Sequence, residues 1–197
     1  TSLVAYDLAS ALSNIKNLLM ADKYERYLAI IKPLIMFTQK NDEHHGVISN
    51  HLASAAAAFE VWEDLSGEKI PQKNKLIDRI LAHQSKEGWF SEYGGADIGY
   101  QSLAISYLAG LHDRGDLDQA IERSLAFFKN FVHPDGSIGG IYGARNTEFY
   151  YPDGIEIYAC CFSDAQAISS FMRQSIANKK CVNLSSIDAP NLIPVFN

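Results

Sequence analysis

The chain has 197 residues and a formal net charge of −6, with 47% hydrophobic and 20% charged residues. This composition is that of an ordinary globular protein with enough apolar residues for a sizeable core. The acidic balance and the lack of any Lys/Arg-rich run argue against a nucleic-acid partner, because phosphate binding needs a basic surface. The longest apolar stretches, such as residues 52–61, fall well short of the roughly 20 residues of a membrane-spanning helix, so no membrane span is expected.

Hydrophobic residues spaced three and four apart predict about seven helices. In chain order they cover residues 3–19, 24–36, 47–64, 72–84, 96–112, 117–132 and 163–177. Pro33 should kink the second helix, and an irregular tail is expected over residues 179–197. No convincing strand is visible. The predicted fold class is therefore all-α.

The predicted helices alternate between small-residue helices, such as the one containing Ala55-Ala56-Ala57-Ala58, and helices with larger aliphatic and charged residues. This alternation favours a partial (α/α) toroid built from helical hairpins, as a single domain over residues 1–197. A plain helical bundle is the alternative. The loops at 86–95 and 133–152 argue against it, because bundle connections usually have about 2–8 residues.

Two further expectations concern the cysteines and the start of the chain. Cys160, Cys161 and Cys181 give neither a disulfide framework nor a metal-binding spacing, so we expect buried thiols. Thr1 leads directly into an amphipathic pattern without a basic or apolar leader, so we expect any signal peptide to have been removed or never to have existed. The start of the chain therefore does not indicate a cellular compartment.

The two long loops are rich in aromatic, acidic and amide side chains. Aromatic faces beside carboxylates and amides commonly hold sugars, and the fork of an arginine recognises carboxylates. The alternative is that the aromatic residues only pack on the helix ends. The candidate substrate-binding residues are Trp89, Glu92, Tyr93, Gln101, Arg145, Asn146 and Glu148.

Two polar positions at helix starts are candidates for catalysis. Asn50 and His51 precede the alanine-rich helix, where a toroid would direct them to its mouth; the alternative is a helix cap. Tyr100 begins the next small-residue helix, and its phenol could transfer protons if a cation lowered its pKa from about 10. The alternative for Tyr100 is a packed ring with a bonded hydroxyl group.

A short acidic and histidine-rich turn, Glu43-His44-His45, precedes these positions. Imidazole and carboxylate groups both suit zinc. Adjacent histidines on a turn usually point in different directions, so no metal or other cofactor is expected.

The order of these motifs resembles the helical domain of the heparinase II/III family of polysaccharide lyases. The similarity covers roughly residues 45–145. The motifs are Asn50-His51-Leu52, Gly88-x-Phe90-x-Glu92, Tyr100 and His133-Pro134-Asp135-Gly136-Ser137-Ile138. In that family an (α/α) toroid packs against a β-sandwich domain, and acidic polysaccharide lies in the cleft between them.

The resemblance implies cleavage of a uronate-containing polysaccharide by β-elimination. Carried over by position, Asn50 neutralises the uronate carboxylate, His51 is one base, Tyr100 is base, acid or both, and Glu92 stands at the cleft wall. Gln101 replaces a histidine that the family often has after its tyrosine. A periplasmic or secreted location is favoured over a cytoplasmic one.

The chain lacks the β-sandwich and has too few helices to close a toroid. We therefore expect a fragment or a reduced relative, with the β-sandwich missing or supplied by a partner chain. Alternatives are a non-catalytic glycan-binding or structural module of surface-polysaccharide metabolism, a uronyl epimerase, and an isoprenoid-cyclase-like toroid. A toroid glycoside hydrolase could pair Glu92 with Asp97 or Glu148.

Overall fold

The computed structural model describes residues 1–43, 45–111, 114–147 and 150–179. In these ranges the chain forms eight α-helices and two short 3₁₀ helices, η1 (Lys16–Leu18) and η2 (Lys129–Phe131). The α-helices are α1 (Ser2–Ile15), α2 (Ala21–Lys40), α3 (Ser49–Ser66), α4 (Gln72–Ala82), α5 (Ile98–Leu108), α6 (Gly115–Phe128), α7 (Asp153–Tyr158) and α8 (Ser163–Ala177). Only isolated β-bridges accompany them in the described part of the chain, which confirms the all-α prediction.

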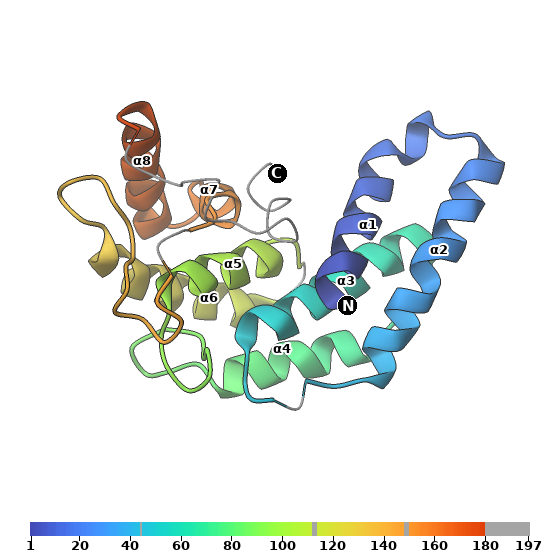
Figure 1. Cartoon of the computed structure of the whole chain (residues 1–197), viewed down its shortest axis with the longest axis horizontal. Helices are drawn as coiled ribbons and strands as arrows, with labels where there is room; N and C mark the ends of the chain where they lie inside the picture. Colours follow the sequence, from blue (N-terminus) through green and yellow to red (C-terminus); the bar gives the residue numbers. More distant parts are fainter. Residues whose placement is uncertain (44, 112–113, 148–149, 180–197) are drawn as a thin grey trace.

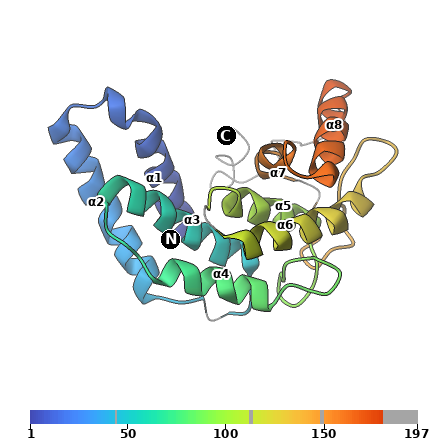
Figure 2. The same ribbon diagram turned by 180° about the vertical axis from the view of Figure 1, so that it is seen from behind.

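The helices follow one another as hairpins along a curved row (Figure 1). The odd-numbered helices contact each other in order, α1 on α3, α3 on α5 and α5 on α7, while each even-numbered helix packs on the helix before it. Seen from both sides, the α1–α2 hairpin lies at one end and α7–α8 at the other, with α3 to α6 between them (Figures 1 and 2). None of the described helices is both long and apolar enough to cross a membrane.

Helix α3 lies at the centre of this row because its small side chains let neighbours approach closely. The four consecutive alanines from Ala55 to Ala58 are all buried. Ala58, Phe59 and Trp62 belong to a hydrophobic cluster shared with α1 and α2, which we call the first cluster. Ala53, Ala56 and Ala57 belong to a larger cluster that includes residues of α4 to α8, the second cluster. The one helix therefore contributes to both cores.

Helix α7 is the element that the sequence pattern did not predict. It has six residues, too few for a hydrophobic period to be recognised. Gly154 lets it approach α5: a Cβ atom there would lie 2.6 Å from both the amide nitrogen and the Cα of Ser106. The hydroxyl of Ser106 also donates a hydrogen bond to Asp153 at 2.5 Å.

Other expectations are tested at single residues. Pro33 lies inside α2, which runs on to Lys40 as one helix. The expected burial of the cysteines is wrong for Cys160 and Cys161, which are both exposed in the turn between α7 and α8, with their sulfur atoms 3.3 Å apart. Cys181 and the predicted tail beyond Lys179 lie outside the described residues.

Candidate functional site

The first long loop lies against the chain segment that leads into α3. The amide of Ser49 donates to the carbonyl of Ser91 at 3.0 Å, and the amide of Tyr93 donates to the carbonyl of Val47 at 3.2 Å. These bonds place Glu92 beside Asn50, whose backbone amide and side-chain Nδ2 donate to Glu92 Oε1 at 3.1 and 2.8 Å. The Asn50 and Glu92 residues are each 1% exposed. Their pairing is therefore a buried contact between the loop and the helix.

Asp97 fixes the second long loop to the start of α5. Its Oδ1 accepts a hydrogen bond from the amide of Tyr100 at 3.1 Å, as an N-cap residue does. Its Oδ2 accepts one from the amide of Arg145 at 2.9 Å, and the hydroxyl of Thr147 donates to Oδ1. One carboxylate thus positions Tyr100 and Arg145 together.

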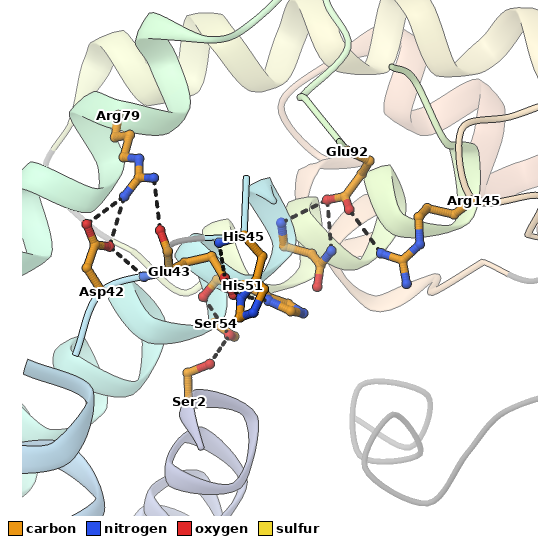
Figure 3. A network of polar contacts seen from close by, with 10 residues as sticks. Ser2, Asp42, Glu43, His45, His51, Ser54, Arg79, Glu92 and Arg145 are labelled. Atoms are coloured by element: carbon orange, nitrogen blue, oxygen red, sulfur yellow. Dashed lines mark hydrogen bonds and ion pairs between the residues drawn. The ribbon is translucent and has the colours of Figure 1, made fainter. Parts of the chain in front are cut away.

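The guanidinium of Arg145 stacks between two phenol rings. Its Cζ lies 4.3 Å from the ring centroid of Tyr100 and 5.0 Å from that of Tyr93. Its Nη2 donates to the Tyr100 hydroxyl at 3.4 Å. Its Nη1 lies 3.6 Å from Glu92 Oε2, as Figure 3 shows. Tyr93 is 54% exposed and Tyr100 is half-buried, so the group has one face toward solvent. We call Asn50, Glu92, Tyr93, Tyr100 and Arg145 the arginine cluster.

The carboxyl group at the inner end of this cluster has a perturbed affinity for protons. The pKa of Glu92 is raised to about 7, mainly by burial and to a smaller extent by the nearby charge of Asp97. The hydrogen bonds from Asn50 and the charge of Arg145 act in the opposite direction but do not outweigh burial. Glu92 therefore changes its charge close to neutral pH.

His51 belongs to a second polar group next to the arginine cluster (Figure 3). Its Nδ1 lies 2.8 Å from Glu43 Oε2, and Nδ1 of His45 lies 2.9 Å from Glu43 Oε1. Hydrogen bonds from His51 and His45 lower the pKa of Glu43 to about 2, so this carboxylate is ionised and accepts both hydrogen bonds. If His51 is neutral and donates through Nδ1, the lone pair of its Nε2 can accept a proton, so that Nε2 acts as the base.

The remaining predicted residues have other partners. The Trp89 indole donates to Glu87 at 3.0 Å. Gln101 is turned toward α6, where its amide donates to the hydroxyl and the carbonyl of Ser124 at 2.8 and 3.1 Å. The Asn146 amide faces the carbonyls of its own loop. Glu148 lies outside the described residues.

Sequence reasoning missed the positioning roles of Asp97 and Glu43. An aspartate three residues before Tyr100 is a recognisable capping pattern and could have been found. The contact between Glu43 and His51 depends on the tertiary fold and leaves no such signal. Among the described residues no group of three or more His, Cys, Asp or Glu side chains has a metal-binding arrangement, and His44 lies outside them.

Comparison of the chain with protein-family models, with curated proteins and with solved structures found no match.

Proposed function

We propose that this chain acts on a uronate-containing polysaccharide by β-elimination, in the manner of heparinase II/III lyases, and that its curved row of hairpins is part of an (α/α) toroid. The observation that supports the proposal best is the Arg145 guanidinium held against the Tyr100 ring at 4.3 Å, beside the buried Asn50–Glu92 pair. A cation, a phenol and an amide are the groups that this reaction needs at one place.

Arg145 is the group best suited to bind the uronate carboxylate. Its side chain is partly exposed, although its Nη1 is buried and faces Glu92 Oε2 at 3.6 Å. A guanidinium binds a carboxylate through paired hydrogen bonds. Neutralising that carboxylate acidifies the proton on C5 of the uronate.

Tyr100 and His51 are the proposed proton carriers. A base removes the C5 proton, the electron pair forms a double bond between C4 and C5, and the C4–O bond breaks as the leaving oxygen receives a proton. The Arg145 Nη2 is 3.4 Å from the Tyr100 oxygen, so the cation stabilises negative charge there while the proton is absent. The Nε2 of His51 supplies a second base.

The test is the appearance of an unsaturated, ultraviolet-absorbing uronate when the protein is incubated with polyuronates and glycosaminoglycans. We expect Tyr100→Phe to lower the rate by about 10²-fold or more, the usual contribution of a general acid or base. Tyr93→Phe is the matched control, since it also removes a hydroxyl from a ring on Arg145 but should retain turnover. Unchanged turnover in Tyr100→Phe would overturn the assignment.

A non-catalytic glycan-binding module is the second candidate. It is favoured by the burial of Asn50, whose amide bonds to Glu92 rather than facing solvent. This function predicts saturable binding of acidic glycans that weakens in Arg145→Ala or Trp89→Ala, without any unsaturated product. Formation of that product would decide for the lyase.

A further inference from the structure

A cavity of about 630 Å³ lies beside α3, on the side of α1, α2 and α4. Its volume is in the range of about 300–1,000 Å³ that is typical of small-molecule sites. Leu52, Ala55 and Phe59 of α3 line it and are buried, so they form an apolar inner wall. Apart from His51 and Glu43, which positions it, the proposed reaction uses none of the residues that line the cavity.

The charge of this cavity is opposite to that of the whole chain. The chain has a net charge of −6, yet the cavity is lined by the cations Lys40, Lys75 and Arg79 against the carboxylates Asp42 and Glu43. Arg79 is engaged by both oxygens of Asp42, at 2.8 and 2.9 Å. The cationic excess therefore rests on the two lysines.

The second carboxylate, Glu43, accepts hydrogen bonds from histidines at both oxygens but keeps its negative charge, which offsets one of the two lysine charges. Within the described ranges, neither Lys40 nor Lys75 forms an ion pair. The three cations against two carboxylates leave the lining with an excess of one positive charge, which attracts an anion.

The uncharged polar lining indicates what kind of anion fits. Two glutamines, Gln39 and Gln72, line the cavity beside the apolar wall. Thr38 and Asn41 line it as well, but their side chains already donate to carbonyls of their own helix, those of Leu34 and Phe37. An apolar wall matches one face of a pyranose ring, and amide and hydroxyl groups match its hydroxyls.

We propose that this cavity binds an anionic sugar, with its carboxylate or phosphate at Lys40 and Lys75 and its ring against Leu52, Ala55 and Phe59. The site is distinct from the arginine cluster, where Tyr100 and Arg145 extend from α5 and the second loop. Binding here requires no turnover. The sugar can be a free sugar phosphate or the uronate of an acidic oligosaccharide.

Isothermal titration calorimetry with a uronate disaccharide, a hexose phosphate and a neutral disaccharide tests the proposal. We expect the anionic ligands to bind and the neutral one not to. Lys40→Gln combined with Lys75→Gln should weaken binding at least about tenfold, because both ammonium charges are lost. The matched control combines Lys16→Gln with Lys23→Gln, which removes two charges outside the cavity.

A second variant, Ala55→Leu, fills the inner wall without changing charge and should also abolish binding. Circular dichroism checks that each variant stays helical. Equal affinities of the two double-lysine variants for the anions, or no binding of either anion to the natural protein, would overturn the proposal. Tighter binding of the hexose phosphate would indicate a free sugar phosphate, and tighter binding of the uronate disaccharide would indicate an acidic oligosaccharide. Tyr100→Phe should leave the affinity for the hexose phosphate unchanged, so this part of the test is independent of the proposed lyase reaction, whose uronate also binds at the arginine cluster.

Discussion

At Glu92, burial and hydrogen bonding act on one carboxyl group in opposite directions. Burial dominates and raises the pKa to about 7 from the usual 4.5, although Asn50 donates two hydrogen bonds to Oε1. The folded chain therefore binds this proton more tightly than the unfolded chain does. The resulting stabilisation is complete below about pH 4.5 and is lost as the pH rises to about 7.

We predict that Glu92→Gln flattens the pH dependence of stability in this window. In the natural protein, Glu92 should make the free energy of unfolding fall by about 1.4 kcal/mol per pH unit between the two pKa values. Glutamine cannot titrate, so the variant should lack this contribution. Urea unfolding at several pH values from 4.5 to 7 measures the difference.

Burial raises the pKa of Asp7 to about 6. Asp7 therefore adds a slope of the same sign to the pH dependence of stability in both proteins, and this contribution cancels when the two are compared. Glu87→Gln is the control, because Glu87 is exposed on the same loop. Parallel curves for the natural protein and Glu92→Gln would show that Glu92 titrates normally.

Single residues also show how far the sequence could predict the site. The loops were recognised from their composition, and Asn50, Glu92, Tyr100 and Arg145 were among the candidates. The contact of Arg145 with Tyr100 joins residues 45 positions apart, which no local pattern reports. Gln101 faces Ser124 because it lies one residue, about 100° around the helix, from Tyr100, and so occupies a buried face.

At the scale of elements, α7 depends on a glycine rather than on hydrophobic periodicity. We predict that Gly154→Ala destabilises the protein by about 1–3 kcal/mol, as overpacking does, because the new methyl group would overlap the backbone of Ser106. Chemical denaturation measures this change. The control is Gly115→Ala at the start of α6, where nothing lies within 4 Å, and a gain of about 0.4–1 kcal/mol is expected. Equal effects at both positions would contradict the close approach of α7 to α5.

The helices that the sequence predicted are those with several turns and an apolar stripe. Residues 72–84 and 163–177 correspond to α4 (Gln72–Ala82) and α8 (Ser163–Ala177). The helix predicted over 117–132 is divided in the structure into α6 and η2, since a change to 3₁₀ geometry preserves much of the hydrophobic pattern. Periodicity thus located the long helices. It could neither find α7 nor define the order in which the helices pack on one another.

At the scale of the whole molecule, α3 joins the two hydrophobic clusters. Phe59 and Trp62 face the first cluster with α1 and α2, while Ala53 and Ala56 face the second cluster. Loss of either cluster removes packing from the same helix. The two ends of the curved row should therefore unfold together, although they share few direct contacts.

This coupling predicts that a core deletion at one end is felt at the other. Ile35→Ala in α2 and Ile121→Ala in α6 each remove a buried side chain, one from each cluster, and should each cost about 2–5 kcal/mol. In a Trp89→Phe background, the fluorescence of Trp62 reports on the first cluster alone, while circular dichroism reports on all helices. Ile121→Ala should shift both signals by the same free energy, because α3 cannot keep one cluster without the other. A shift in circular dichroism alone would mean that the two ends of the row unfold separately.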